Sequence, residues 1–478
     1  MKTKILFIIL FSSNLIANAQ KKIDKLVKEY ETQGYSGTIL VAKGNRILYA
    51  SGYGISDQSS LKKNTVNTRY KTESIGKLFT ATLVMQEIES GRLKLDDALE
   101  KFFPKVYQNG QNITIHHLLS HTSGFTETEM NPSFKPGTPY TRQQILELRS
   151  EAPRAFSIPG EKFQYSNLGY TLLAEILEKI NGKSFDSIIH ERIFNLSSMN
   201  NTGHVEDTII YKNVAKPYVW LSSKKYMEET RMIGKRANAS GGWISTVNDF
   251  YRFTENFISY KYIKPETWSI MKTANSNGGT EFQPGYFYTY GLNITNLTKD
   301  KILYGHTGGG GGYGCDLYFE PHSGYIVINF MNMYGDSRLM TKNIFRFLLN
   351  EKVEPVKKWG DVVFGDIIEA KGLEEFSKNY KQYLSEKGIL PNTPGGFNRI
   401  ASAYDDIDDQ QTRTAILKAG LNEFPEGGIL WLNLGRSLRK QGLKEEAIGA
   451  VNQGLKIAKK ADDKFLQTML NNEFSKLN

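Results

Sequence analysis

The 478-residue sequence predicts an α+β fold, in which helices flank an antiparallel sheet and an all-helical region follows. Three observations lead to this prediction. Strand-like runs stand within Gly37–Gly52 and return only at Lys301–Met331. The residues between them, roughly 95–290, have mostly helical hydrophobic spacing. After about residue 350 the chain is charged and helical in pattern, without strand signals. We therefore expect one sheet assembled from both sets of strands, with a helical lobe between them in sequence.

The first elements follow from hydrophobic periodicity. A short amphipathic helix is predicted over Lys21–Gln33, because its apolar residues recur on one face. The two β-rich runs of Gly37–Gly52 are separated by Lys43–Asn45, which is typical of a hairpin turn. From Ser74 to about Arg92 the apolar positions again recur at helical spacing, which predicts a longer helix.

Later elements are predicted in the same way. Tyr170–Ile180 is the clearest helix of the middle region. Strand signals return at Lys301–Tyr304, Asp316–Glu320 and Gly324–Met331, and the last two are joined by the turn Pro321–Gly324.

A domain boundary is predicted near residue 350, which divides residues 20–350 from a C-terminal region, residues 351–478. In that region Trp431, Leu434 and Gly435 follow the tetratricopeptide scheme W-x2-L-G. The alternative is an ordinary helical hairpin, because about three such repeats are needed to bury a core. We expect a repeat-like helical region that offers a surface for a protein partner.

Composition excludes several classes of protein. The formal net charge is +10, but the basic residues are scattered among acidic ones, so no nucleic-acid partner is expected. One cysteine excludes a disulfide framework and a thiolate zinc cluster. His117 and His121 have helical i, i+4 spacing without an H-E-x-x-H motif, so we expect them to hydrogen-bond the turn that leads to Gly124. No metal or cofactor is predicted.

Residues 1–19 have the pattern of a secretory signal peptide. Lys2 and Lys4 precede a short apolar run, and the segment ends in Ala17-Asn18-Ala19. Cleavage is expected before Gln20. The apolar run is shorter than the ~20 residues that span a bilayer, and no cysteine follows the cleavage site. The prediction is an exported protein without a stable membrane anchor, periplasmic in a host with two membranes.

Ser74 and Lys77 form the sharpest local feature. If Ser74 opens the predicted helix, the two side chains lie one turn apart on the same face. A serine hydroxyl becomes a good nucleophile only when a neighbouring base removes its proton, and a lysine does so only in its neutral form. The helix start also favours developing negative charge. An N-capping serine beside a solvated lysine is the alternative interpretation.

Two further segments carry polar groups of suitable chemistry. Tyr165 and Asn167 stand two residues apart before an apolar helix, so an extended backbone points them the same way. The tyrosine can transfer a proton, and the asparagine amide can hold a lysine or a substrate carbonyl; a half-buried aromatic and a helix cap are the alternatives. The second segment, Tyr304–Gly314, begins in a strand and continues through His306, Thr307 and five glycines, which allow a substrate to approach the backbone.

Three motifs of penicillin-recognising serine hydrolases, S-x-x-K, Y-x-N and K/H-T-G, occur in their usual order in this sequence. They are found at Ser74–Lys77, Tyr165–Asn167 and His306–Gly308. The chain resembles the class C β-lactamase branch, with its related esterases and D-amino-acid peptidases, over about residues 30–350. The resemblance implies a β-lactamase/transpeptidase-like fold for this part of the chain.

The resemblance also implies a role for each site residue. Ser74 would be the acylated nucleophile, Lys77 its general base, and Tyr165 a proton relay to the leaving group. Asn167 would position Lys77 and the substrate amide. The substrate-binding residues would be His306, Thr307, Gly308 and Gly309. The backbone N–H groups of Ser74 and Gly309 would donate to the oxyanion.

One departure affects the expected activity. Many relatives carry a lysine where His306 stands, and a histidine is only partly protonated at neutral pH, so its hold on a substrate carboxylate is weaker. The resemblance therefore implies an exported serine hydrolase that acts on a D-amino-acid peptide or a small ester, with weak β-lactam turnover at best. The alternative is a penicillin-binding-like sensor or adaptor that works through its C-terminal region.

Overall fold

The computed structural model describes residues 18–103, 113–125, 158–206, 212–229, 237–273, 286–333, 338–356, 360–386 and 394–477. The chain forms two compact units. The first comprises Met1–Tyr218 and Glu228–Val356, and the second comprises Val219–Met227 and Lys357–Asn478. The predicted leader, residues 1–19, lies almost entirely outside the described residues.

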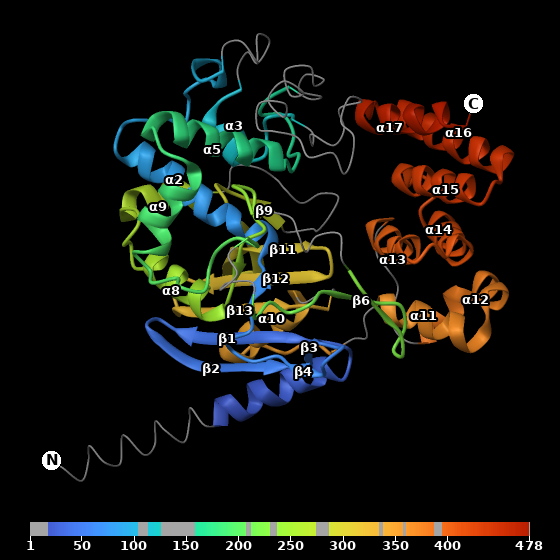
Figure 1. Cartoon of the computed structure of the whole chain (residues 1–478), viewed down its shortest axis with the longest axis horizontal. Helices are drawn as coiled ribbons and strands as arrows, with labels where there is room; N and C mark the ends of the chain where they lie inside the picture. Colours follow the sequence, from blue (N-terminus) through green and yellow to red (C-terminus); the bar gives the residue numbers. More distant parts are fainter. Residues whose placement is uncertain are drawn as a thin grey trace. The chain divides into compact units, whose positions relative to one another are not determined.

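A seven-stranded antiparallel sheet with the strand order β2-β1-β13-β12-β11-β10-β9 forms the centre of the first unit (Figure 1). Its strands are β1 Gly37–Lys43, β2 Arg46–Tyr53, β9 Tyr286–Tyr288, β10 Asn293–Thr298, β11 Lys301–Gly310, β12 Tyr313–Glu320 and β13 Tyr325–Met331. Because β1 pairs with β13, the N-terminal hairpin and the late strands belong to one sheet. This confirms the predicted α+β fold.

Helices cover both faces of this sheet. The α-helices that the structure describes in the first unit are residues 18–31, α2 Lys77–Glu89, α3 Ile115–Leu119, α5 Asn167–Asn181, α6 Phe185–Ile189, α8 Val247–Ile258, α9 Pro265–Met271 and α10 Arg338–Leu348. Phe250 of α8 packs on Phe330 of β13, with ring centroids 5.3 Å apart. Phe330 is paired with Cys315, so the next residue, Asp316, points to the opposite face. There Thr341 of α10 donates to Asp316 at 3.0 Å.

Short two-stranded ladders complete the first unit. They are β3 Ile55–Asp57 with β4 Lys62–Lys63, and β5 Tyr70–Lys71 with β8 Ile244–Ser245. Strand β5 lies shortly before Ser74 in the sequence, and β8 begins directly after Trp243. Their pairing therefore brings these two distant segments together.

Within the seven-stranded sheet, the sequence prediction missed β9 and β10 and made β11 and β12 too short. Neither β9 nor β10 was expected, because Asn293–Thr298 is rich in Asn and Thr and lacks the apolar alternation of a half-buried strand. The strand predicted at Lys301–Tyr304 continues to Gly310. Pairing with β12 holds the glycine-rich end in the sheet, although glycine alone favours no strand.

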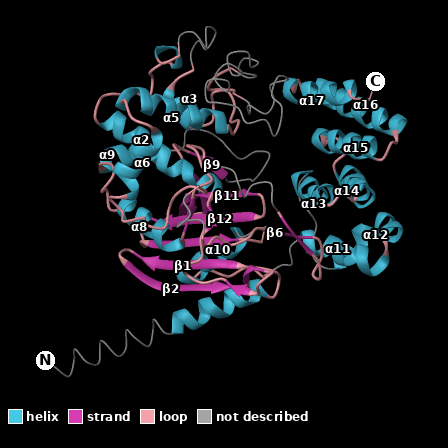
Figure 2. Ribbon diagram, in the orientation of Figure 1, coloured by secondary structure: helices cyan, strands magenta, loops and turns pink. Residues whose placement is uncertain are grey.

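Helices make up most of the second unit (Figure 2). These are α11 Gly360–Lys371, α12 Leu373–Glu386, α13 Pro394–Asp406, α14 Gln410–Glu423, α15 Gly428–Lys440, α16 Lys444–Lys460 and α17 Lys464–Ser475. This confirms the predicted helical C-terminal region, while its assignment to tetratricopeptide repeats stays a prediction. Among the described residues, no helix combines the length and the apolar character needed to cross a membrane.

The second unit also contains residues Val219–Met227, which are most of a hairpin made by β6 Tyr218–Trp220 and β7 Tyr226–Glu228. Tyr404 donates to the carbonyl of Leu221 at 3.0 Å, and Ser222 donates to Glu369 at 2.8 Å. Gly365 packs directly on the Leu221 carbonyl, where any side chain would overlap it. The helical unit is therefore discontinuous in sequence.

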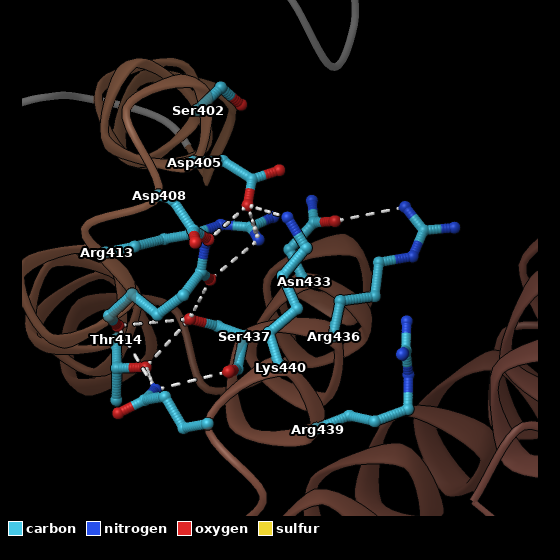
Figure 3. A network of polar contacts seen from close by, with 12 residues as sticks. Ser402, Asp405, Asp408, Arg413, Thr414, Asn433, Arg436, Ser437, Arg439 and Lys440 are labelled. Carbon is cyan, nitrogen blue, oxygen red and sulfur yellow. Dashed lines mark hydrogen bonds and ion pairs between the residues drawn. The ribbon is translucent and has the colours of Figure 1, made fainter.

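A polar network links three helices of this unit (Figure 3). Arg413 of α14, only 5 % exposed, contacts Asp405 of α13 at 2.5 Å, and Lys440 of α15 reaches the same carboxylate oxygen at 2.7 Å. Gln410 accepts a hydrogen bond from Ser437 of α15 at 3.0 Å. Buried charges of this kind are stable only when paired and hydrogen-bonded.

Candidate active site

Ser74 and Lys77 are in hydrogen-bond contact. Ser74 lies in a 3-10 turn, Glu73–Gly76, so it precedes the first residue of α2 instead of opening that helix as the sequence suggested. Lys77 is the first residue of α2, and its Nζ lies 3.2 Å from Ser74 Oγ. The lysine is 0 % exposed, whereas Ser74 is half-buried. A ligand can thus reach the hydroxyl but not the amine behind it.

Two carbonyl oxygens also contact Lys77 Nζ. They are Oδ1 of Asn167 at 2.6 Å and the main-chain oxygen of Ser240 at 2.8 Å. Both oxygens can only accept hydrogen bonds. As an ammonium group Lys77 donates to these oxygens and to Ser74 Oγ; once it has lost a proton, its amine has a lone pair that can accept the proton of the neighbouring Ser74 hydroxyl. The site is therefore arranged for removal of the serine proton.

Tyr165 lies beside Lys77. The distance from Lys77 Nζ to the centroid of the Tyr165 ring is 4.8 Å. Asn167 is the first residue of α5, and Ser166, rather than Asn167, caps that helix by accepting from the Gly169 N–H. Tyr165 and Asn167 thus both approach Lys77, as the spacing predicted.

Three residues of a distant loop hold the turn around Ser74. Glu73 has a φ of +44°, a conformation that few residues other than glycine adopt, and its carbonyl accepts from Gly242 N at 3.1 Å. The Trp243 carbonyl accepts from Thr72 N at 2.7 Å. A Cβ on Gly241 would overlap the Glu73 carbonyl, so only glycine fits there. This loop fixes the strained turn that presents the nucleophile.

Strand β11 passes directly beside the nucleophile turn. A Cβ on Gly308 would overlap the Thr72 carbonyl and lie 3.0 Å from the Ser74 nitrogen. Thr307 is half-buried and Gly309 is exposed. The structure therefore brings Gly308 of β11 next to Ser74, and the neighbouring Gly309 is open to a ligand.

His306 is buried and uncharged. Its side chain is 1 % exposed, and its Nε2 lies 3.0 Å from the hydroxyl of Tyr288. Burial, and then the nearby charge of Lys77, lowers the pKa of His306 to about 3. The ring is therefore neutral at neutral pH, and not partly protonated as the sequence suggested. It offers no charge to a substrate carboxylate.

Sequence reasoning missed several residues that shape the site. Ser240 contributes a main-chain oxygen, which no side-chain pattern reveals, and Tyr288 lies on the unpredicted strand β9. The His117 imidazole caps the start of α3 by accepting from the Thr114 N–H, and the His121 imidazole accepts from the N–H of Ser166, 45 residues later, and not from the turn leading to Gly124 as expected. Among the described residues, no cluster of His, Cys, Asp or Glu is suited to bind a metal ion.

Comparison with known proteins agrees with this geometry. The sequence profile of the Beta-lactamase family matches residues 19–349. Penicillin-binding protein 4* of Bacillus subtilis (strain 168) is 29 % identical over 314 residues, which cover 62 % of this chain and 68 % of that protein. The teichoic acid D-alanine hydrolase of Staphylococcus aureus is 22 % identical over 343 residues, covering 72 % and 81 % of the two chains.

Solved structures show the same fold. The octameric penicillin-binding protein homologue from Pyrococcus abyssi has a TM-score of 0.61 and 26 % identity, covering 74 % of this chain and 82 % of its own. A D-amino acid amidase from Ochrobactrum anthropi SV3 has a TM-score of 0.61 and 19 % identity, covering 70 % and 99 %. The matched family region ends before the helices of the second unit. Since the family profile spans more than half of the chain, this protein belongs to the Beta-lactamase family of serine hydrolases.

Proposed function

We propose that this protein hydrolyses an ester or amide of a D-amino acid through an acyl-enzyme on Ser74. The observation that carries the proposal is the contact between Ser74 Oγ and the buried amine of Lys77, which Asn167 Oδ1 and the Ser240 carbonyl also hold in place. A potential base in contact with a half-buried serine hydroxyl is the arrangement that nucleophilic catalysis requires.

Acylation follows from this geometry. Lys77 takes the proton of Ser74 as Oγ attacks the substrate carbonyl carbon, and the carbonyl oxygen becomes an oxyanion. The N–H groups of Ser74 and Gly309 stabilise this charge, because β11 lies against the Ser74 nitrogen. Tyr165 passes a proton to the leaving alcohol or amine as the bond to the carbonyl carbon breaks. Asn167 holds Lys77 in place.

Deacylation reverses these steps with water. Tyr165 lies beside Lys77 and is half-buried, so it can take a proton from a water molecule that attacks the acyl-enzyme. Ser74 Oγ leaves and recovers its proton from Lys77. The free acid is released.

The neutral His306 favours esters and amides over β-lactams. A β-lactam antibiotic carries a carboxylate beside its ring, and His306 has no charge for it at neutral pH. Relatives named a teichoic acid D-alanine hydrolase and a D-amino acid amidase support D-alanyl esters and D-amino-acid amides as the first substrates to test.

A parallel rate measurement on four substrates tests the proposal. These are a p-nitrophenyl ester, a D-alanyl ester, a D-amino-acid amide and nitrocefin. We expect turnover of the esters or the amide that is lost in Ser74→Ala, and nitrocefin hydrolysis that is far slower. Nitrocefin turnover that matches the best ester would contradict the substrate assignment. Binding of a covalent probe at Ser74 without turnover of any of them would favour the sensor or adaptor instead.

Export belongs to the same proposal. The leader has a basic start, an apolar run and an Ala17-Asn18-Ala19 end. This pattern supports secretion with cleavage before Gln20. Expression of the full chain in a host with two membranes, followed by mass spectrometry of the periplasmic fraction, tests it. The expected mature chain begins at Gln20, and recovery of only the uncleaved chain in the cytoplasm would contradict it.

A further inference from the structure

His121 is a buried residue to which the proposed reaction gives no role. It lies in the turn after α3, is 1 % exposed and has a φ of +56°. Positive φ values are uncommon outside glycine and persist only where the surroundings hold them. The contacts of His121 show what it holds.

Both neighbours of Tyr165 are hydrogen-bonded to His121. The main-chain N–H of Gln164 donates to the carbonyl oxygen of His121 at 2.7 Å. The main-chain N–H of Ser166 donates to His121 Nδ1 at 3.1 Å. One residue thus fixes the backbone on each side of the phenol.

The imidazole ring also packs on the Tyr165 ring. The two centroids are 4.2 Å apart and the ring planes are inclined by 33°. The rings of Tyr170 and Tyr288 also lie close to the imidazole, at 5.0 and 4.6 Å. Because these rings enclose the imidazole, the phenol of Tyr165 rests on a rigid aromatic support.

The contact with Ser166 also defines the protonation of the ring. Nδ1 accepts a main-chain N–H, so it carries no proton, and the imidazole is neutral. Burial, followed by the nearby charge of Lys77, keeps the pKa of His121 well below its ordinary value. A neutral ring adds no positive charge beside Lys77, and its burial keeps it from touching substrate.

We propose that His121 is a positioning residue, which holds the Tyr165 phenol where it exchanges protons with the leaving group and with water. The inference rests on the proposed function, because it assigns His121 an effect only through Tyr165. Misplacement of a reacting group by about 1 Å can cost about 100-fold in rate.

Two substitutions separate the contacts. His121→Phe keeps an aromatic ring but removes the acceptor for the Ser166 N–H. His121→Asn keeps an acceptor at the position of Nδ1, because Asn Oδ1 and His Nδ1 are both attached to Cγ. Asparagine also tolerates positive φ. We expect kcat on the best ester to fall about 10- to 100-fold in His121→Phe and less in His121→Asn, with KM changed less than about threefold in both. His322→Asn, at a site 97 % exposed, is the matched control and should keep full activity.

A double-mutant cycle with Tyr165→Phe gives the decisive readout. Tyr165→Phe keeps the ring on which His121 packs and removes only the hydroxyl. If His121 acts through that hydroxyl, His121→Phe should change kcat less than about twofold in the Tyr165→Phe background. Independent losses that multiply in the double variant would overturn the inference, because they would mean that His121 acts only on general structure.

The remaining outcomes are also informative. If His121→Phe does not fold, as shown by loss of its cooperative melting, the same cycle is run with His121→Asn. If Tyr165→Phe keeps full kcat while Ser74→Ala is inactive, the inference about His121 fails although the serine hydrolase stands. If Ser74→Ala keeps the activity of the parent chain, the proposed function itself fails.

Discussion

At the scale of single residues, the environment of Lys77 determines what Ser74 can do. The amine is fully buried and contacts two acceptors and one hydroxyl. An exposed lysine three residues after a serine has the same sequence spacing, but its amine is not held by fixed hydrogen-bond acceptors. The S-x-x-K pattern therefore predicts a reaction only where the fold encloses the lysine.

Substitution of the proposed base tests this directly. Lys77→Ala removes the proton acceptor, so the rate of acylation in single-turnover kinetics should fall about 10²- to 10⁴-fold. Lys183→Ala, whose side chain is 54 % exposed, is the control and should have no effect. Acylation at a near-normal rate in Lys77→Ala would show that another group deprotonates Ser74.

His306 makes a separate prediction about pH and stability. Its folded-state pKa of about 3 lies below the ordinary value of 6.5, so the unfolded chain binds a proton that the folded chain does not. The free energy of unfolding should therefore fall as pH falls from about 6.5 towards 3. Between pH 7 and pH 5, His306→Gln should lose about 1–2 kcal/mol less stability than the parent chain.

Chemical denaturation at both pH values measures this difference. His322→Gln is the matched control, because this side chain is 97 % exposed. The same loss of stability in His306→Gln and in the parent chain would mean that His306 is already protonated, or remains solvated, in the folded protein.

At the scale of elements, the site depends on the close approach of β11 to the turn that carries Ser74. Gly308 permits this approach, since a Cβ there would overlap the Thr72 carbonyl. At this contact, the absence of a side chain on Gly308 allows the strand to lie against the nucleophile.

Gly308→Ala should therefore displace β11 from Ser74. Loss of one oxyanion donor typically costs about 10²- to 10³-fold in kcat, and we expect a loss of this order. Gly449→Ala is the control, because a Cβ at that exposed position in α16 would meet nothing within 4 Å. Full activity of Gly308→Ala, measured on the best ester, would show that the strand need not lie so close.

The elements also show how far the sequence could be interpreted. The hairpin within Gly37–Gly52 and strand β13 were predictable, because each is a continuous β-rich run. Strand β10 was not, because its Asn and Thr residues become a strand only through pairing with β9 and β11. Motif spacing found the side chains of the site, whereas contacts such as the Ser240 carbonyl on Lys77 depend on distant segments and leave no local pattern.

At the scale of the whole molecule, the chain divides into two units with separate cores. The helical unit takes up the hairpin Val219–Met227 from within the sequence of the hydrolase unit. A simple cut after residue 350, as the sequence suggested, would thus leave this hairpin without Glu369 and Tyr404, to which it is bonded.

The polar network of the helical unit gives a prediction that is independent of catalysis (Figure 3). Arg413→Met removes a buried partner of Asp405, and we expect the free energy of unfolding to fall by about 1–3 kcal/mol. This is less than the value for a fully buried pair, because the Asp405 side chain is 29 % exposed. Lys418→Met breaks only the exposed pair with Glu446 and should cost less than about 0.5 kcal/mol. Unfolding followed by the helical circular dichroism signal measures both, and equal effects would contradict the role of the network.

The intact mass of the protein after reaction with a fluorophosphonate probe tests the central assignment most directly. The account predicts one covalent adduct, located at Ser74 by peptide mapping, that is absent in Ser74→Ala and forms much more slowly in Lys77→Ala. An adduct at any other residue, or equal labelling of the parent chain and Ser74→Ala, would contradict it.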